Sequence, residues 1–380
     1  MPRRSQGERL HTALEDKVSS SASTSPGSIP ATLSSTNAEE DDRFKPRLAP
    51  GWVFARLSPA IPSVAYDTYW RFAAERQRVY FRRLSSNPPP WTDDQILQEF
   101  RFTNVYRASD RVTQYLIRHV IYGSHYDRHG SPEEVVFRVI LFKLFNRVST
   151  WRLFEHAYEA VTLKSYNFDR FDQILTRALG AGARLYSAAY IMPMAGRRYS
   201  RKHRTHLRLL EYMLADGLPL RLTRARSMQE AFLALRSYPS IGDFLGCQFI
   251  TDLNYSELMD FSESEFVVPG PGAKDGIAKC FTATGGLNGA EVIRLMMDRQ
   301  EEEFERLGIV FPSLWGRRLQ LIDCQNLFCE VAKYTRVSHP SLPGISGRKR
   351  IKQRFRPVPD PVPAWFPPKW GINCQIGSQP

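Results

Sequence analysis

The 380-residue sequence contains no run of eighteen or more apolar residues, and its N-terminus, MPRRSQGERLHTALEDK, lacks the apolar stretch of a secretory signal. We therefore expect no membrane partner. Cysteine is scarce as well, and the closest pair is separated by four residues, whereas zinc and iron–sulfur sites normally use closer pairs. The pattern predicts free thiols in a reducing compartment and no metal site. The cysteines are Cys247, Cys280, Cys324, Cys329 and Cys374.

Three catalytic motifs are also missing: the Gly-x4-Gly-Lys-Ser/Thr loop that cradles phosphates, the Gly-x-Ser-x-Gly nucleophile turn and the His-Glu-x2-His zinc helix. Their absence excludes P-loop kinase chemistry from this chain, and we expect no bound cofactor. A glycine-rich segment, VVPGPGAKDGI at 267–277, does occur. Its composition favours a structural turn over a ligand-binding loop.

Positive charge is abundant. The net charge is +13 and the isoelectric point is near 9.6, whereas 42% apolar and 24% charged residues are ordinary for a globular protein. Such an excess indicates a polyanionic partner, and nucleic acid is the better candidate because nothing spans a bilayer.

Composition divides the chain into three parts. Residues 1–45 are rich in Ser and Thr and are predicted to be disordered, residues 50–343 form the core, and residues 344–380 combine a basic cluster with a Pro- and aromatic-rich segment. We expect Trp365, Phe366 and Trp370 to pack this last segment onto the core in extended form. The basic cluster and the N-terminal extension suggest a nuclear protein.

The core is predicted to be all-α. Apolar residues recur at helical spacing, and one irregular or strand-like piece is expected at 265–272. Ser131, Pro132 and Glu134 are typical of a helix start with a capping box, before a run that is apolar nearly all round. The helices are expected at 66–85, 103–122, from Pro132 through the apolar run 135–148, and at 149–161, 169–180, 203–215, 227–237, 243–251, 289–306 and 322–334.

Two segments leave alternatives open. YPSIGDF at 238–244 fits either a plain helix–helix turn or a helix-hairpin-helix, whose turn presents N–H groups to a DNA phosphate. Basic residues at 197–226 and 348–356 favour the hairpin. In LIDCQNLFCEVAKYTRV at 321–337, a polar stripe of Asp323, Asn326, Glu330 and Lys333 fits either a solvated face or the wall of a cleft. His203 and His206 lie in a basic run and are expected to be solvated.

Several long motifs resemble a known family. FTNVYRASDRVTQYLIRHVIY, EEVVFRVILFKLFNRVSTW, PSIGDFLGCQFITDLNYS, EFVVPGPGAKDGIAKCF and LIDCQNLFCEVAKYTRV resemble the helical domain of 5-hydroxymethyl-deoxyuridine DNA kinases and the related α-glutamyl/putrescinyl thymine pyrophosphorylases. The resemblance covers about residues 60–370. It implies a helix-hairpin-helix, DNA glycosylase-like fold that takes a flipped base from duplex DNA.

The resemblance also implies a reaction in thymine hypermodification. In that family a kinase activates the 5-hydroxymethyl group of a base as a pyrophosphate ester, and a partner protein displaces pyrophosphate with an amine or amino acid. Two departures disfavour base excision. Ser240 stands where the hairpin usually has its first glycine, and VVPGPG lies about where a glycosylase has its catalytic Asp.

The reaction needs cations for the leaving pyrophosphate and a carboxylate that takes a proton from the amine. Asp252 or Asp323 is the candidate base, and Asp110 would instead hold Arg107 or Arg111 in place. The other substrate-binding candidates are Asn104, Arg107, Arg111, Asn254, Tyr255, Gly270, Gly272, Gly276, Asn326, Glu330 and Lys333. The DNA-binding candidates are Ile241, Gly242, Arg197, Arg198, Arg201, Lys202, Arg348, Lys349 and Arg350.

Two other functions stay open. A non-catalytic module would recognise modified bases or recruit a separate kinase or oxygenase, and a glycosylase-type repair protein is the third hypothesis. Convergence of Arg107, Asp252, Asn254, Asp323 and Glu330 in one enclosed pocket beside the glycine-rich loop would favour an enzyme.

Overall fold

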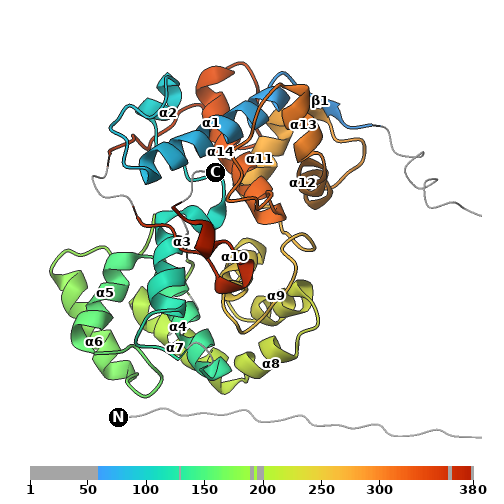
Figure 1. Ribbon diagram of the computed structural model, residues 1–380. Helices are drawn as coiled ribbons and strands as arrows, with labels where there is room; N and C mark the ends of the chain where they lie inside the picture. The colour runs from blue at the N-terminus through green and yellow to red at the C-terminus, as the bar shows by residue number, and fades with distance from the viewer. Residues whose placement is uncertain (1–58, 128–129, 189–191, 195–200, 358–361, 378–380) are drawn as a thin grey trace, which may run out of the picture. The chain divides into compact units, whose positions relative to one another are not determined.

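The computed structural model describes residues 59–127, 130–188, 192–194, 201–357 and 362–377, which form an all-α fold, as predicted (Figure 1). The predicted tail at 1–45 lies outside the described residues. The helices are α1 (Tyr66–Leu84), α2 (Gln95–Glu99), α3 (Arg111–Tyr115), α4 (Pro132–Phe145), α5 (Val148–Ala157), α6 (Phe168–Gly180), α7 (Lys202–Ala215), α8 (Leu218–Arg224), α9 (Met228–Arg236), α10 (Asp243–Leu253), α11 (Pro271–Cys280), α12 (Gly289–Asp298), α13 (Gln300–Arg306) and α14 (Leu321–Ser338). Two very short antiparallel strands, β1 (Ile61–Pro62) and β2 (Phe281–Ala283), pair with each other.

Two groups of helices build the core. In one, α14 packs against α1, α11 and α12, and Figure 1 shows α11 and α14 close together. In the other, α4 packs against α7, α8 and α10. Because α4 is apolar on nearly every side, it is buried along most of its length, as its sequence predicts. Within the described residues no helix is long and apolar enough to cross a bilayer.

The start of α4 differs in one detail from the prediction. Ser131 accepts a hydrogen bond from Glu134 N, and Pro132 begins the helix. The carboxylate of Glu134 does not return to Ser131. It accepts instead from Leu163 N at 3.0 Å, which ties α4 to the segment before α6.

The predicted helix at 103–122 is broken into three pieces: the 3₁₀ turn η4 (Arg107–Ser109), α3, and the π-helical turn η5 (Leu116–Ile121). Asp110 has extended backbone angles and interrupts the helix between the first two. The amphipathic pattern was therefore misleading at this segment. His119, placed on the apolar side by the pattern, is exposed, whereas Arg107 and Gln114 from the polar side are buried.

Other predicted boundaries also changed. The 289–306 segment forms two helices, α12 and α13, which are separated at Arg299. Residues 266–270 have no regular structure, but α11 begins directly after them, and this helix was missed because Gly and Pro disfavour helices. The short helices α2 and α8 were missed as well.

The segment 362–376 packs along the core. Phe366 is fully buried, and the backbone N–H of Trp365 donates to Gln114 Oε1 at 2.9 Å. Trp370 contacts Tyr255 edge-on, with the ring centroids 5.6 Å apart. The C-terminal aromatic residues therefore reach the centre of the fold.

The two histidines of α7 are buried, contrary to the prediction that they are solvated. His203 Nε2 lies 2.9 Å from Asp172 Oδ1. His206 Nδ1 accepts from the Tyr186 hydroxyl, and its Nε2 donates to Pro193 O, each at 2.8 Å. Both ring nitrogens of His206 are therefore used when the ring is neutral.

We predict that His206 makes the protein sensitive to acid. Burial lowers the pKa of His206 to about 4, from an ordinary value of 6.5. Between these two pH values the unfolded chain binds a proton that the folded chain does not, so stability falls as the pH falls through this window. The free energy of unfolding of His206→Gln should depend less on pH between 6.5 and 4 than that of the wild type. The exposed His125→Gln is the control, and identical pH profiles for wild type and His206→Gln would contradict the prediction.

Candidate functional site

A buried charge network lies at the centre of the candidate site. Arg107 donates from Nη1 and Nη2 to the two carboxylate oxygens of Asp252, at 2.6 and 2.9 Å, and from Nε to Gln248 Oε1 at 2.9 Å. Lys143 Nζ lies 2.7 Å from the same carboxylate. Two cations from η4 and α4 therefore share one carboxylate of α10, and all three side chains are almost inaccessible to water.

The pKa of Asp252 follows from these contacts. Burial alone would raise it, but Arg107 and Lys143 together outweigh burial and hold the pKa below its ordinary value. Asp252 is consequently ionised and fully paired at neutral pH. A general base needs a free lone pair within reach of its substrate, and this carboxylate offers none while both partners are in place.

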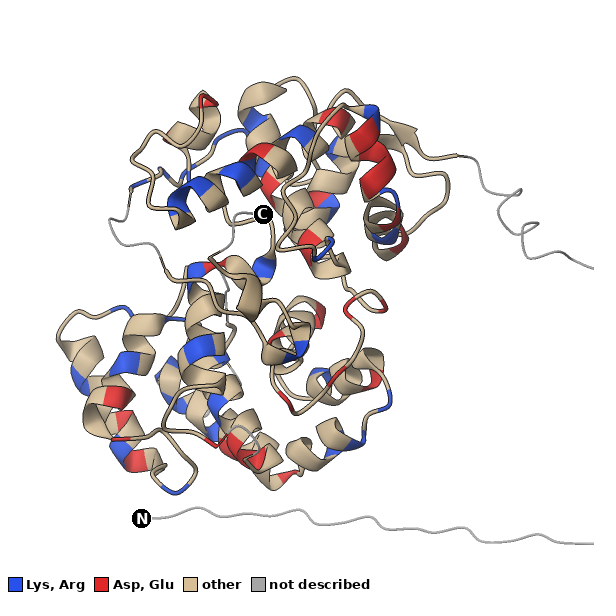
Figure 2. Ribbon diagram, viewed as in Figure 1, with Lys and Arg blue, Asp and Glu red and all other residues tan. Residues whose placement is uncertain are grey.

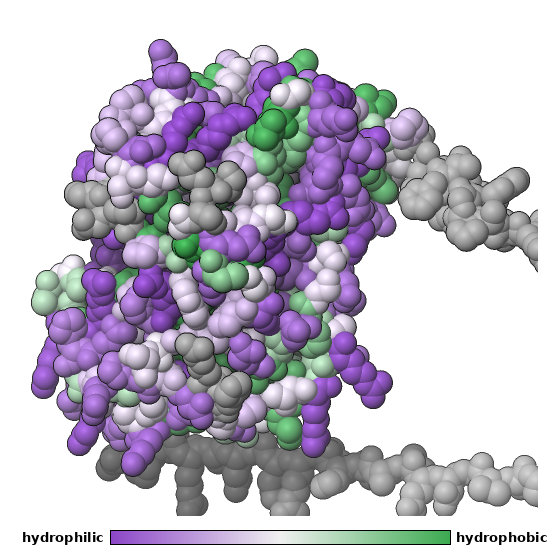
Figure 3. Space-filling view, in the orientation of Figure 1, coloured by the Kyte–Doolittle hydropathy of each residue, from purple (hydrophilic) through white to green (hydrophobic). Residues whose placement is uncertain are grey.

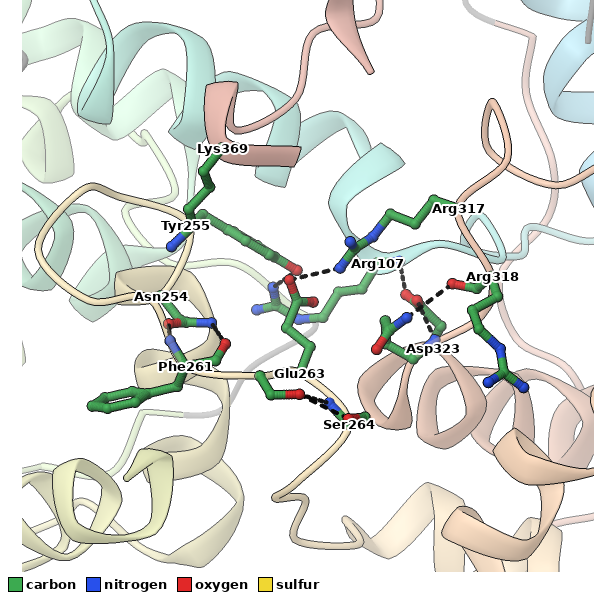
Figure 4. Close-up of polar contacts among 12 residues, drawn as sticks. Arg107, Asn254, Tyr255, Phe261, Glu263, Ser264, Arg317, Arg318, Asp323 and Lys369 are labelled. Carbon is green, nitrogen blue, oxygen red and sulfur yellow. Dashed lines mark hydrogen bonds and ion pairs between the residues drawn. The ribbon is translucent and has the colours of Figure 1, made fainter. Parts of the chain in front are cut away.

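Asp323 is positioned differently. Its Oδ1 accepts from the backbone N–H of Arg107 at 2.8 Å, and its Oδ2 accepts from Gln320 N at the start of α14 (Figure 4). Burial raises the pKa of Asp323 to about 7. That value suits acid–base chemistry, but both oxygens are already engaged with backbone N–H groups.

The polar stripe of α14 has a partner that neither alternative anticipated. It faces the extended backbone before η4, and four contacts follow one another along both segments. Lys333 Nζ donates to Arg101 O at 2.7 Å, Glu330 Oε2 accepts from Thr103 N at 3.0 Å, Asn326 Nδ2 donates to Asn104 O at 2.8 Å, and Asp323 completes the series at Arg107 N. The stripe thus fixes the segment that carries Arg107.

Asn104 connects this segment to α1. Its side chain accepts from Arg76 Nη2 at 2.6 Å and donates to Ser109 O at 2.7 Å, while its backbone N–H donates to Asp110 Oδ1 at 2.8 Å. Burial raises the pKa of Asp110 to about 6. The Arg107 guanidinium donates to the carboxylate of Asp252, Asp110 accepts from Asn104, and Arg111 is exposed.

A second set of charges lies beside Tyr255 (Figure 4). Arg317 pairs with the buried Glu263 at 2.8 Å and stacks over the Trp370 ring at 3.7 Å. Lys369 donates to backbone carbonyls at the end of the α10 region, including Ser256 O at 3.2 Å. These contacts extend the charge network to the C-terminal segment, and sequence spacing gave no sign of them.

Asn254 and the glycines have packing partners. The Asn254 side chain pairs with both backbone groups of Phe261, at 2.9 Å each. A Cβ on Gly270 would meet the Phe244 ring, and one on Gly272 or Gly276 would meet α14 at Cys329 or Phe328. Gly272 and Gly276 therefore allow α11 to pack closely against α14.

The α9–α10 turn contains one residue in the left-handed region. Ser240 adopts a left-handed conformation with φ of 67°, at the position where a hairpin usually has glycine, and its hydroxyl donates to Met194 O. Ile241 is buried and Gly242 is exposed at the N-terminus of α10. Asp243 in the first turn pairs with Arg236, so a carboxylate already lies next to this helix end.

The basic candidates lie apart from the network. Arg201, Arg348, Lys349 and Arg350 are exposed, and Lys202 stacks over the Tyr186 ring at 4.3 Å. Arg197 and Arg198 lie outside the described residues. Figure 2 shows Lys and Arg on both helix groups, including α1, and the face drawn in Figure 3 is mainly hydrophilic.

Eight of the predicted residues therefore converge in a buried network, whereas Arg111, Asn254 and the three glycines have other surroundings. Arg107, Asp252, Tyr255 and Asp323 form one part of this network, and Asn104, Asn326, Glu330 and Lys333 form the adjoining part. In the part of the chain that the structure describes, no group of three or more His, Cys, Asp or Glu is arranged to hold a metal ion.

Comparison with known proteins identifies the relatives of the chain. Residues 63–344 match the family described as 5-hmdU DNA kinase, helical domain. The 5-hmdU DNA kinase of Bacillus phage SP10 is 24% identical over an alignment of 297 residues that covers 73% of this chain and 46% of that protein. The chain thus spans less than half the length of the curated relative it matches. No solved structure matches it.

Proposed function

The chain belongs to the family of the 5-hmdU DNA kinase helical domain, and from this premise we propose that it acts on a modified thymine in DNA. The family match over residues 63–344 carries the proposal. The net charge of +13 and the exposed basic residues beside the tail support contact with a phosphate backbone, and the left-handed turn at Ser240 supports a DNA-gripping hairpin.

The proposed reaction is substitution at the 5-methylene carbon of a pyrophosphorylated hydroxymethyluracil. The nitrogen of an amine or amino acid forms a bond to this carbon while the carbon–oxygen bond breaks. Pyrophosphate leaves with the electron pair, and the nitrogen loses a proton to a base. The chain has no Gly-x4-Gly-Lys-Ser/Thr loop, so a separate kinase would supply the activated base.

A mass-spectrometric assay tests the reaction. DNA carrying the pyrophosphorylated base is incubated with the full-length chain and a mixture of amines, and the nucleosides are then analysed. We expect a new amine adduct that is absent without protein and absent with unmodified DNA. Binding of the modified DNA without any adduct would contradict the catalytic proposal.

One observation favours a second candidate, the non-catalytic module. Both candidate bases, Asp252 and Asp323, use both carboxylate oxygens within the fold. Binding without adduct would support this module, which would recruit a kinase or oxygenase to modified DNA. Release of free base in the same assay would instead indicate a glycosylase.

A further inference from the structure

A pocket of about 380 Å³ lies against α1, and the segment 89–92, α2 and the segment 355–357 complete its wall. Its volume is within the range of small-molecule sites. Arg76, Val79 and Arg83 recur at helical spacing, so one face of α1 lines the pocket. The rest of the wall is mainly apolar or aromatic, and it includes Trp91, Leu97, Phe100, Phe102 and Phe355.

The aromatic wall is held in place by backbone contacts. Trp91 Nε1 donates to Asn87 O at 2.6 Å, and Trp91 O accepts from Arg82 Nη1 at 2.5 Å. The backbone N–H of Phe355 donates to Glu99 O at 2.9 Å, and the Phe355 ring meets the Trp91 ring edge-on with 6.2 Å between the centroids. A wall that is already fixed lowers the entropic cost of binding a ligand.

Arg83 is the polar side chain of the wall that is available to a ligand. The other polar side chains of the wall each make a hydrogen bond within the fold, and they are Arg76, Thr92 and Gln98. The Arg83 guanidinium is half-buried and lies over the Trp91 ring at 4.9 Å, but it makes no hydrogen bond or ion pair with any residue in the described ranges. A guanidinium that stacks on an aromatic face keeps its N–H donors in its own plane, where a planar acceptor can reach them.

The charge of Arg83 is not balanced by its surroundings. Burial and the neighbouring Arg111 lower the pKa of Arg83, and no carboxylate among the described residues opposes them. Burial also lowers the pKa of Arg76, but there Asp110 and Glu330 act in the opposite direction. Arginine stays protonated despite such a shift, so an anionic group bound at Arg83 would balance a charge that the fold leaves uncompensated.

We propose that this pocket binds a small apolar monocarboxylate, with its apolar body among Trp91, Phe102 and Phe355 and its carboxylate at the Arg83 guanidinium. The match is geometric as well as electrostatic, because a guanidinium can donate two parallel N–H bonds to one carboxylate. Since the rest of the wall is mainly apolar, the rest of the ligand is apolar too. Such a ligand is not a nucleic acid, and the inference therefore goes beyond the proposed function.

Two matched pairs of probes test the proposal: octanoate with octanol, and naphthoate with naphthol. Within each pair the apolar body is nearly the same, whereas only the carboxylate carries a charge at neutral pH. Their affinities for the full-length chain are measured by calorimetry. We expect at least one carboxylate to bind with one-to-one stoichiometry and about tenfold more tightly than its alcohol, which is the size of effect expected for a charged hydrogen bond.

Three variants assign the binding to this pocket. Arg83→Gln should weaken binding of the carboxylate about tenfold and leave binding of the alcohol unchanged. Phe355→Ala should weaken binding of both, because it removes part of the apolar wall. Arg71→Gln removes an exposed charge of α1 outside the pocket and should change neither affinity.

The outcomes are distinguishable from those of the adduct assay, because none of these probes contains nucleic acid. No binding of either carboxylate to the wild type overturns the proposal, and so does a carboxylate affinity that Arg83→Gln leaves unchanged. Adduct formation on modified DNA without any carboxylate binding keeps the proposed reaction and overturns the pocket. Alcohol binding that persists in Arg83→Gln shows that the pocket is still folded in this variant, and Phe355→Ala, at a half-buried position, provides the second test.

Discussion

Replacing Asp252 with asparagine is expected to lower the free energy of unfolding by about 3–5 kcal/mol. The carboxylate is fully buried and is the shared partner of Arg107 and Lys143. Asparagine keeps the shape of the side chain but leaves two buried cations without a counter-charge. Its amide NH₂ group would also face the N–H donors of Arg107 or Lys143. Urea unfolding followed by circular dichroism measures the loss.

Two further variants sharpen this prediction. Asp260→Asn also removes a carboxylate beside a lysine, but Asp260 is 88% exposed, so its ion pair with Lys369 should contribute less than about 1 kcal/mol. Adding Lys143→Met to Asp252→Asn removes one of the unpaired cations and should recover part of the lost stability. A cost for Asp252→Asn as small as that for Asp260→Asn would show that the ion network is not needed for folding.

The pH dependence of the same group has a defined sign. The folded pKa of Asp252 lies below its unfolded value, so its contribution to stability is present above the ordinary aspartate pKa and is lost as the pH falls through the folded value. The contribution of His206 to stability is lost as the pH falls below 6.5, which is a higher pH than the one at which Asp252 is protonated. Acid unfolding should therefore begin with the histidine, before the Arg107–Asp252 pair is protonated.

The regular helices could be predicted from sequence because their local signals agree with their environment. The apolar residues of α1 and α4 recur at helical spacing, and Ser131 and Pro132 mark the start of α4. The 103–122 segment could not be predicted in this way. Its backbone is held by side chains of α14 more than two hundred residues away, and this tertiary contact replaces the helix that local periodicity favours.

The candidate site shows the same division. Most members of the buried network could be identified from the sequence, because they lie in unusual motifs or on the polar stripe of α14. Lys143, Gln248 and Glu263 could not be identified in this way, and the environment of Arg76 could not be predicted. Lys143 lies within an apolar helix, and its polar neighbour at helical spacing, Asn146, is no acidic partner that would mark an ion pair. Its role depends on Asp252, which comes from a different helix.

The other large effect is expected from Gly276→Ala, which should reduce the free energy of unfolding by about 3 kcal/mol or more. A Cβ at this position would lie 2.1 Å from Phe328 O and 2.7 Å from Phe328 C, which are backbone atoms of α14. Backbone in the middle of a helix cannot move aside as a flexible side chain does, so α11 and α14 would have to separate. Denaturant unfolding measures the loss.

Gly180→Ala is the matched control, since Gly180 is the last residue of α6 and a Cβ there would meet nothing within 4 Å. This control should be neutral or gain up to about 1 kcal/mol from helix propensity. Gly272→Ala should fall between the two, because its Cβ would meet the Sγ of Cys329 at 2.9 Å, a side-chain atom that can shift. If Gly276→Ala folded with wild-type stability but bound modified DNA less tightly, the glycine would serve ligand approach, as the sequence suggested, and not helix packing.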